Sequence, residues 1–177
     1  ILANAFSLEG EKPFLSIYST FLQRGYDEIQ QDLARMQGNV VIGIDRAGIV
    51  GEDGETHQGI FDIAILNNIP NIIIMAPHDS KEAGDMLYTA FQTKGLVAIR
   101  YSKDKVKYDE AKYTLQNIGE WKIMSYLEKR ACDGYLISYG DFLNTALEIQ
   151  EDLKTKNIYL QVINACYIKP MDMKILA

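Results

Sequence analysis

The sequence predicts an α/β fold in which an open parallel sheet carries helices on both of its faces. Short apolar runs of strand length recur along the first hundred residues, and they are continuous, as in strands buried on both faces of a parallel sheet. Helical patterns lie between them, and this alternation is typical of an open parallel sheet. The predicted strands are residues 13–17, 39–44, 71–75 and 96–99.

Two helices are predicted between these strands. The first covers residues 21–36, where apolar side chains share one face and Ser19 or Thr20 is available as the N-cap. The second begins after Asp79, which we expect to cap it together with Ser80. Its apolar residues at helical spacing are Ala83, Met86, Leu87 and Ala90.

Polarity rises at residues 102–112, which indicates a linker. After it, a strand end and turn at 137–141, a helix at 143–153 and a strand at 159–163 suggest the first βαβ unit of a second α/β domain. Both chain ends lie inside apolar segments, so we expect a fragment whose second domain is truncated. The predicted division is a first domain at 1–103, a linker at 104–120 and a truncated domain at 121–177.

Composition narrows the class of protein. The chain has 177 residues, 47% hydrophobic and 24% charged, with a net charge of −6 and interspersed acids and bases. Nucleic-acid binding is therefore disfavoured. No apolar run is close to the length of a membrane span, which needs about 18 residues. There is no basic segment typical of a signal peptide. Cys132 and Cys166 lack metal-ligand spacing and read as reduced thiols, so we expect a cytoplasmic protein.

Polar and aromatic side chains follow each of the four predicted strands. Ligands of open parallel sheets bind beyond the carboxyl ends of the strands, so these side chains predict a small-molecule site. They are Tyr18, Phe21 and Arg24 after the first strand, Arg46 and a glycine-rich loop after the second, His78 after the third, and Arg100 and Lys103 after the fourth.

The loop DRAGIVGEDGETHQG, residues 45–59, carries most of the candidate chemistry. Asp53 and His57 are close enough in sequence for a short turn to bring both inward, and a carboxylate beside an imidazole suits anion binding or proton transfer. The spacing equally allows Asp53 to lie in a solvated turn and His57 to bond a helix end.

The other candidates also have structural interpretations. Tyr18, Phe21 and Arg24 could share a helix face, and Phe21 alone is more typical of a core residue. Arg24 argues against a core stripe because it needs an anion or a carboxylate partner. A structural or exposed role is favoured for His78. Arg100 and Lys103 could hold a phosphate or begin the solvated linker.

Three stretches resemble one enzyme family. They are YSTFLQRGYDEIQQD from residue 18, DRAGIVGEDGETHQGIFDIAILNNIPNIIIMAP from residue 45 and VAIRYSK from residue 97. They are similar to the 1-deoxy-D-xylulose 5-phosphate synthases, a family of the transketolase-like group that depends on thiamine diphosphate. The similarity covers residues 1–103 and continues more weakly to 168–172. True transketolases share only GEDGxTHQ, so the flanking DRAGIV and YSTFLQR favour the synthase.

The resemblance implies the pyrimidine-binding module of the thiamine-diphosphate-binding fold, followed by the start of the family's C-terminal domain. Its enzymes condense pyruvate with D-glyceraldehyde 3-phosphate, with loss of carbon dioxide, in the first step of non-mevalonate isoprenoid biosynthesis. The product also feeds thiamine synthesis. The family is dimeric, so a homodimer is expected of the intact enzyme.

The resemblance also implies residue roles. Phe21 would stack on the aminopyrimidine of the cofactor, with Tyr18 and Arg24 lining the substrate pocket beside it. Asp53 and His57 would face the reacting end of the cofactor, with His57 assisting proton transfer. In all, it implies catalytic roles for His57 and Asp53, cofactor binding by Phe21 and Tyr18, and substrate binding by Tyr18, Arg24, Arg46, Arg100 and Lys103.

Two departures limit what the resemblance implies. The family's RYPR, whose last arginine binds substrate phosphate, reads RYSK here, and Lys103 lacks the bidentate fork of arginine. The family's catalytic glutamate would lie before Ile1, and its diphosphate and Mg²⁺ ligands belong to an N-terminal domain outside this sequence. We therefore expect no metal ligands in this chain, and no activity from it alone.

Two other functions remain open. One is a transketolase-type subunit that pairs with a separate diphosphate-binding subunit. The other is a noncatalytic α/β module for binding or assembly. Substitution of Asp53, His57 or Arg24 would impair an enzyme and leave such a module unaffected.

Overall fold

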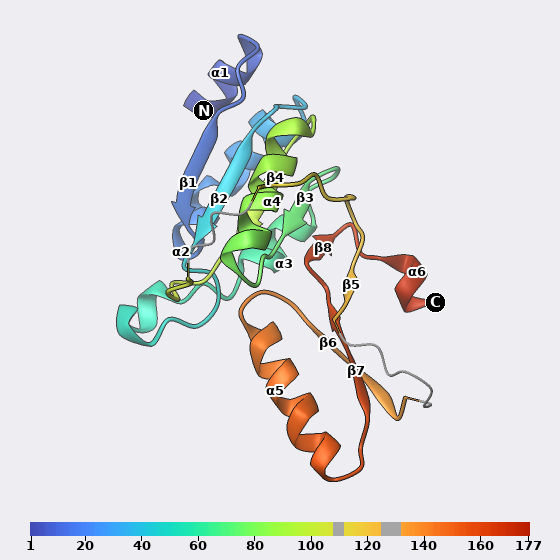
Figure 1. Ribbon diagram of the computed structural model, residues 1–177. Coiled ribbons are helices and arrows are strands. Elements are labelled where there is room, and N and C mark those ends of the chain that lie inside the picture. The colour runs from blue at the N-terminus through green and yellow to red at the C-terminus, as the bar shows by residue number, and fades with distance from the viewer. Residues whose placement is uncertain (108–111, 125–131) are drawn as a thin grey trace.

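The computed structural model describes residues 1–107, 112–124 and 132–177, and it contains two sheets (Figure 1). The first sheet has the strand order β1-β2-β4-β3-β8 and the second has the order β5-β7-β6. The predicted α/β fold is confirmed. The strands of the first sheet are β1 (Phe14–Tyr18), β2 (Val41–Asp45), β3 (Ile73–Met75), β4 (Val97–Arg100) and β8 (Tyr167–Lys169).

The four predicted strands are parallel neighbours in the first sheet. Their register places Tyr18 beside Asp45 and Ile44 beside Arg100, so the carboxyl ends of β1, β2 and β4 meet at one edge. The fifth strand differs from the parallel sheet that we predicted, because β8 pairs with β3 in the antiparallel direction. This short strand arrives from the far end of the chain.

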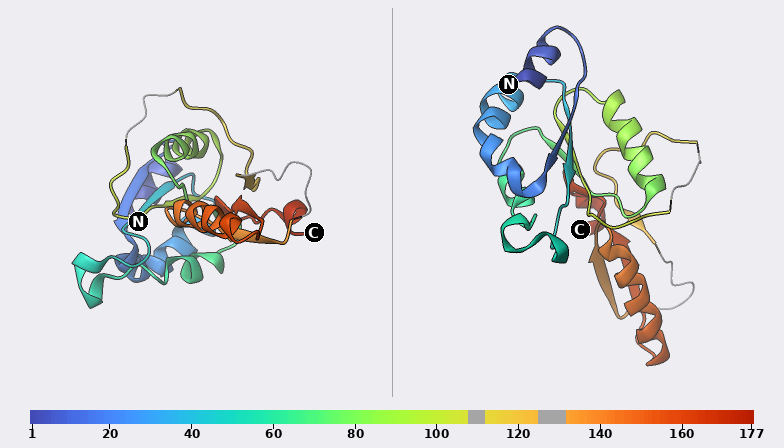
Figure 2. Two further views of the ribbon diagram at one scale, coloured as in Figure 1. Left: turned by 60° about the horizontal axis from the view of Figure 1, so that its bottom comes forward. Right: turned by 90° about the vertical axis from the view of Figure 1, so that its left-hand side faces the viewer.

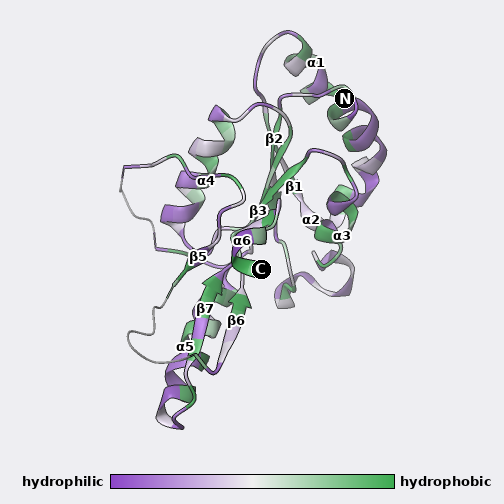
Figure 3. Cartoon of the chain, turned by 90° about the vertical axis from the view of Figure 1, so that its right-hand side faces the viewer, coloured by the Kyte–Doolittle hydropathy of each residue, from purple (hydrophilic) through white to green (hydrophobic). Residues whose placement is uncertain are grey.

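Helices cover both faces of the first sheet, with α4 on one face and α2 and α3 on the other (Figures 2 and 3). The predicted helix at 21–36 is instead a succession of short helical segments that ends at Ala34. Gln37 then adopts a left-handed conformation with φ 58°. The helical elements here are α1 (Leu2–Leu8), α2 (Ser19–Leu22), η1 (Gln23–Gly25), the π-helical η2 (Glu28–Ala34), α3 (Asp62–Asn67) and α4 (Ser80–Gln92).

The two predicted caps have different outcomes. Asp79 caps α4, because its side chain accepts a hydrogen bond from the Glu82 N–H at 2.7 Å. The cap by Ser19 or Thr20 was wrong. Tyr18 occupies the N-cap position of α2 without a side-chain bond, and the Thr20 hydroxyl donates to the Thr56 carbonyl instead.

Each face of the sheet has its own apolar core, because alternate residues of β2 point to opposite sides. Ile42 and Ile44 pack toward α2 and α3, whereas Val41 packs toward α4. Beside Val41, Gly43 leaves room for the Phe14 ring, which a Cβ would approach more closely than 3.0 Å.

The second sheet contains the predicted βαβ unit. In it, β6 (Gly134–Ser138) and β7 (Leu160–Asn164) are parallel and are joined by α5 (Phe142–Thr155), whose Leu143 and Ala146 pack on Val162. The short β5 (Lys122–Ile123) pairs with β7 in the antiparallel direction, and α6 (Met173–Leu176) follows β8.

The core on the α4 side of the first sheet continues into the second sheet through Ile163 of β7. Trp121 and Tyr167 pack with Met75 and Met86 of the first sheet's α4 side, and the Trp121 indole donates to the Tyr167 carbonyl at 2.8 Å. The division at 1–103, 104–120 and 121–177 stays a prediction, and residues 108–111 of the linker lie outside the described residues. Among the helices that the structure describes, none is long and apolar enough to cross a membrane.

Candidate active site at the carboxyl edge of the first sheet

The glycine-rich loop projects from the carboxyl edge of the first sheet, as the teal segment below β1 and β2 in Figure 1. Its two ends are joined by paired backbone bonds between Gly48 and Gly59, of 2.7 and 2.8 Å. Gly59 allows this closure because a Cβ there would lie closer than 3.0 Å to the Arg46 carbonyl and the Ser19 side chain. The loop is thus anchored on the chain that follows β2 and on α2.

The interior of the loop is organised by Gln58. Its side-chain oxygen accepts from the Val50 N–H at 2.7 Å, and its amide nitrogen donates to the carbonyls of Val50 and Gly54 at 2.8 and 2.6 Å. Two single-turn 3₁₀ helices, η3 (Gly51–Asp53) and η4 (Glu55–His57), meet at Gly54, which has a φ of 74°. These short turns place Asp53 and His57.

Three aromatic rings line the site. The Tyr18 and Phe21 ring centroids are 5.5 Å apart, and the His57 ring meets Phe21 edge-on at 5.3 Å with an interplanar angle of 82°. Phe21 is 42% exposed, so it is not the core residue that its helical spacing also allowed. Leu22 fills the core beneath it.

A network of four charged groups lies beside these rings. Arg46 lies over the Tyr18 ring, with its guanidinium carbon 4.6 Å from the centroid, and it pairs with Asp53. Lys103 donates to Asp53 at 3.0 Å and to Glu52 at 2.9 Å. The hydrogen bonds from Arg46 and then Lys103 lower the pKa of Asp53, so this carboxylate stays ionised.

Arg46 is held in a left-handed backbone conformation with φ 54°, which is uncommon for a residue with a side chain. Its N–H donates to the Asp45 carboxylate at 2.7 Å, and the next N–H, of Ala47, donates to the Tyr101 carbonyl at 2.9 Å. Such conformations cluster at functional sites and persist where the surroundings over-determine them.

Asp53 and His57, whose sequence spacing allowed either a shared inward turn or separate structural roles, are not paired in the part of the chain that the structure describes. Across the described residues, no ion pair or hydrogen bond joins them: Asp53 is held by Arg46 and Lys103. The His57 Nδ1 atom lies 2.8 Å from the Thr56 hydroxyl.

Arg100 and Arg24 have contrasting surroundings. Arg100 donates to the buried Asp62 from Nε at 2.8 Å and from Nη2 at 3.4 Å, and it faces the Tyr139 ring at 5.6 Å. Arg24 is exposed, and within residues 1–107, 112–124 and 132–177 it forms no ion pair. Its charge is therefore available to a ligand, whereas that of Arg100 is already paired.

His78 lies apart from this site, in contact with α4. Its Nδ1 atom is 2.7 Å from the Glu82 carboxylate, which also accepts from Lys122 at 2.6 Å. The structural role that we favoured for His78 agrees with these contacts.

Sequence reasoning missed several residues that shape the site. Thr20, Thr56 and Gln58 act through hydrogen bonds that cross between α2 and the loop or close the loop on itself. Asp62 is the partner of Arg100 across 38 residues of sequence. All four residues lie inside the stretches from residues 18 and 45 that resemble the synthase family, and this resemblance is the signal that could have found them.

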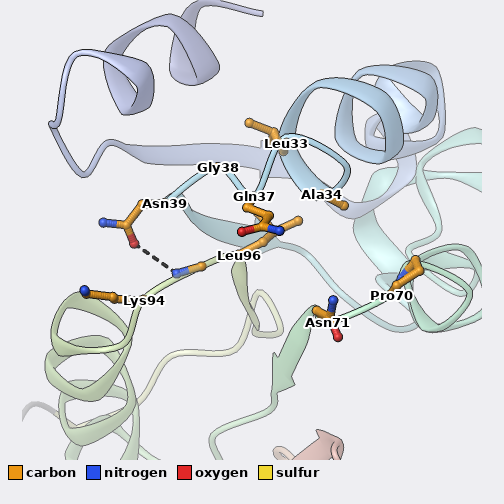
Figure 4. Close-up of a pocket in the computed structure, with 10 residues that line it drawn as sticks. Leu33, Ala34, Gln37, Gly38, Asn39, Pro70, Asn71, Lys94 and Leu96 are labelled. Atoms are coloured by element: carbon orange, nitrogen blue, oxygen red, sulfur yellow. Dashed lines mark hydrogen bonds between the residues drawn. The ribbon is translucent and has the colours of Figure 1, made fainter.

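A separate hollow of about 500 Å³ lies at the opposite, amino edge of the sheet (Figure 4). Gln37, Asn71 and Lys94 line it, and Asn39 closes one side by accepting a 3.2 Å bond from the Gly95 N–H. Since ligands of open parallel sheets bind at the carboxyl edge, this hollow is not the candidate active site. Among the described residues, no group of three or more His, Cys, Asp and Glu side chains could hold a metal ion.

Comparison with known families agrees with this geometry. The family model for the transketolase pyrimidine-binding domain matches residues 2–108, and the one for the transketolase C-terminal domain matches residues 125–177. The chain therefore belongs to the transketolase family.

Within that family, the curated relatives include the 1-deoxy-D-xylulose-5-phosphate synthases of Geobacillus sp. (strain WCH70) and Bacillus velezensis, at 46% and 42% identity over 179 residues. The synthase of Listeria welshimeri is also 46% identical. These relatives confirm the resemblance drawn from the sequence. Each match covers 99% of this chain and 27–28% of the relative, so the chain spans little more than a quarter of their length.

Solved transketolases share the fold. A structure described as a split gene transketolase, an inactive beta4 tetramer, matches with a TM-score of 0.85 and 25% identity, covering 99% of this chain and 56% of that one. A transketolase mutant from Pichia stipitis matches with a TM-score of 0.76 and 18% identity, covering 90% of this chain and 24% of that one.

Proposed function

We propose that this chain forms part of the active site of a 1-deoxy-D-xylulose 5-phosphate synthase, which condenses pyruvate with D-glyceraldehyde 3-phosphate and releases carbon dioxide. The observation that carries the proposal is the grouping of Phe21, His57, Tyr18 and the Arg46–Asp53 pair at the carboxyl edge of the sheet. The choice of reaction is supported by the similarity to relatives named 1-deoxy-D-xylulose-5-phosphate synthase.

The aromatic residues fit thiamine diphosphate, the cofactor of this enzyme class. Phe21 is 42% exposed although it stands over a fully buried Leu22, and a ring held open in this way suits stacking against a flat heterocycle. Phe21 would hold the aminopyrimidine, with Tyr18 at its side. When bound, the cofactor supplies the nucleophilic carbon and the electron sink for decarboxylation.

The polar residues would bind the substrates and move protons. His57 is half-buried with one ring nitrogen bonded to Thr56, so its Nε2 atom is available to give or take a proton. The ionised Asp53 fixes Arg46 and Lys103. Arg24, whose charge is unpaired within the described part of the chain, would attract the carboxylate or phosphate of a substrate.

A chimera tests this proposal. The 179 aligned residues of the Geobacillus synthase are replaced by this chain, and product formation from pyruvate and glyceraldehyde phosphate is assayed with thiamine diphosphate and Mg²⁺. We expect deoxyxylulose phosphate to form. A folded chimera that makes none, while the Geobacillus parent assayed alongside is active, would contradict the proposal.

His57→Ala in the active chimera gives the first prediction. We expect turnover to fall by about tenfold or more, on the scale of a lost acid–base group. His78→Ala is the matched control, because the other histidine of the chain lies outside the site, and its turnover should stay within about twofold of the parent's. Unchanged turnover in His57→Ala would remove His57 from the mechanism.

The proposal extends to the cofactor ligands and the assembly of the intact enzyme. We infer that residues outside these 177 bind the diphosphate of the cofactor and Mg²⁺. We also infer that the enzyme is a homodimer and that it is cytoplasmic. Gel filtration with light scattering on the chimera measures the assembly, with a dimer as the expected result.

A transketolase-type subunit is the second candidate. It is supported by the split gene transketolase structure, of which this chain covers 56% at a TM-score of 0.85. It predicts that the chimera transfers two-carbon units between sugar phosphates and ignores pyruvate. A noncatalytic module predicts neither activity.

A further inference from the structure

The partner of the His57 imidazole is a hydroxyl group. Thr56 Oγ1 lies 2.8 Å from His57 Nδ1, while the His57 and Phe21 rings form a T-shaped contact with centroids 5.3 Å apart. Asp53, the carboxylate that the sequence suggested as a neighbour of His57, is engaged by Arg46 and Lys103. The Nδ1 atom of His57 therefore has the Thr56 hydroxyl as its hydrogen-bond partner.

A hydroxyl partner differs chemically from a carboxylate partner. A carboxylate only accepts hydrogen bonds, so it favours a protonated Nδ1 and the cationic ring. In the neutral ring a hydroxyl bonds more strongly as the donor to a bare Nδ1, because an unprotonated imidazole nitrogen is a better acceptor than a hydroxyl oxygen. In the cationic ring the same hydroxyl can turn and accept from the protonated Nδ1, because it is both donor and acceptor. Thr56 can thus stay bonded to Nδ1 while a proton comes and goes at Nε2.

Thr56 is itself held in place from both directions. Its carbonyl accepts from the Thr20 hydroxyl of α2 at 3.2 Å, and the following N–H, of His57, donates to the Gly54 carbonyl at 3.3 Å. The Thr20 bond connects the loop to the helix that carries Phe21. The Thr56 hydroxyl and the Phe21 ring, which both contact His57, therefore belong to segments that are joined by a hydrogen bond.

We propose that Thr56 is a positioning residue: its hydroxyl donates to His57 Nδ1 in the neutral ring, selects the Nε2–H tautomer and leaves that proton for the substrate. The assignment rests on the proposed function only in calling His57 the proton-transfer group. Histidine nitrogens are commonly set in this way, by the hydrogen bond that the other ring nitrogen makes.

Nitrogen NMR of the 177-residue chain tests the tautomer directly. The chain has two histidines, so ¹⁵N-labelled imidazole gives two sets of signals, assigned with a His78→Gln variant. Spectra are recorded at about pH 8.5, above the ordinary titration range of imidazole. We compare the parent with Thr56→Val, which removes the hydroxyl at similar shape, and with Thr56→Ser, which keeps it.

The expected result is a His57 ring that is mainly the Nε2–H tautomer in the parent and in Thr56→Ser. In Thr56→Val the ratio of tautomers should shift toward Nδ1–H by about two- to tenfold, the range for one net hydrogen bond. The His78 signals should not change. A His57 ratio that stays within twofold of the parent's in Thr56→Val overturns the proposal, and Thr56→Ala replaces the valine variant if that variant does not fold.

Turnover in the chimera supplies a second readout. Thr56→Val removes the bond that orients the ring as well as the tautomer preference, so it should lower kcat by about tenfold, more than the change in tautomer ratio alone. The KM for pyruvate should stay within twofold, and Thr56→Ser should restore kcat. The two proposals can be contradicted independently. An inactive parent chimera would contradict the proposed function, and the tautomer measurement would still decide whether Thr56 positions His57. An unchanged tautomer ratio in an active chimera would contradict only the positioning role of Thr56.

Discussion

At the scale of single residues, the glycines of the loop differ in whether a side chain could fit in their place. Gly59 lies against the Arg46 carbonyl and Ser19, where a Cβ would come closer than 3.0 Å, whereas Gly51 has open space around it and no left-handed backbone. Gly59→Ala must therefore push apart the bonded ends of the loop. We expect it to lower the free energy of unfolding by about 1–3 kcal/mol, as overpacking does.

Urea denaturation of the two variants checks this difference. Gly51→Ala, the matched control in the same loop, should change the free energy of unfolding by no more than about 0.5 kcal/mol. If both variants unfold at the same urea concentration, the close approach at Gly59 does not restrict the loop. Steric room, which the sequence does not record, separates glycines that look equivalent in it.

At the scale of secondary-structure elements, the two long helices provide a matched pair of N-termini. Asp79 precedes α4 and accepts the Glu82 N–H at 2.7 Å, while Asp141 precedes α5 without a capping bond. Asp79→Ala should cost about 1 kcal/mol of stability and Asp141→Ala much less. Asp79→Asn should retain most of the stability, because asparagine also caps. Thermal unfolding compares the three, and equal losses for Asp79→Ala and Asp141→Ala would contradict the capping argument.

The two N-cap predictions show which features of the structure can be read from the sequence. Asp79 was predicted correctly because a polar residue followed by a clear helical pattern is a local signal. Ser19 and Thr20 were equally suitable by type, but Thr20 is drawn to the Thr56 carbonyl, a contact between segments 36 residues apart. Local propensity is visible in the sequence, and competition from distant partners is not.

The strands and the site residues follow the same rule. Four parallel strands were predicted from continuous apolar runs. By contrast, β8 is only three residues long, follows closely after β7 in the sequence and pairs with the distant β3, so its apolar residues did not mark a separate strand. The candidate site residues lie at the carboxyl edge of the sheet, while their catalytic and binding roles stay predictions. The ion pairs among them were not visible in the sequence, since Asp53 is held by Arg46 and Lys103 and not by His57.

At the scale of the whole molecule, a buried charged cluster joins the two sheets. Glu82 of α4 accepts bonds from His78 at 2.7 Å, from Lys122 of β5 at 2.6 Å and from Asn164 of β7 at 3.1 Å. The Glu82 side chain is only 2% exposed. Because removal of one partner from a buried ion pair leaves the others uncompensated, Glu82→Gln should lower the free energy of unfolding by about 3 kcal/mol.

An exposed ion pair gives the control for this substitution. Glu151 pairs with Lys154 on α5, and its side chain is 69% exposed. Glu151→Gln should change the free energy of unfolding by less than about 1 kcal/mol, the range for surface pairs. Urea denaturation at pH 6 compares the two variants, and similar losses would mean that burial does not strengthen the Glu82 cluster.

The cluster also predicts how stability depends on pH. Burial alone would raise the pKa of Glu82, but the bonds from His78 and Lys122 outweigh it and lower the pKa from 4.5 to about 2. The contribution of a carboxylate with a lowered pKa is complete above its ordinary value and is lost as the pH falls through the folded value. For His78, burial lowers the pKa, but Glu82 and Asp79 raise it overall, so its contribution is complete below about 6.5 and is lost at higher pH.

These opposite signs place the greatest effect of the cluster between about pH 4.5 and 6.5. The difference in unfolding free energy between the parent and Glu82→Gln should be largest in that window. It should fall to less than half at about pH 3, where the unfolded carboxylate is protonated, and it should fall only partly at pH 8, where Lys122 still pairs with Glu82. Urea titrations at pH 3, 5.5 and 8 measure the difference. A difference that is constant across the three values would show that Glu82 contributes by its shape and not by its charge, and the joint between the two sheets would then be insensitive to pH.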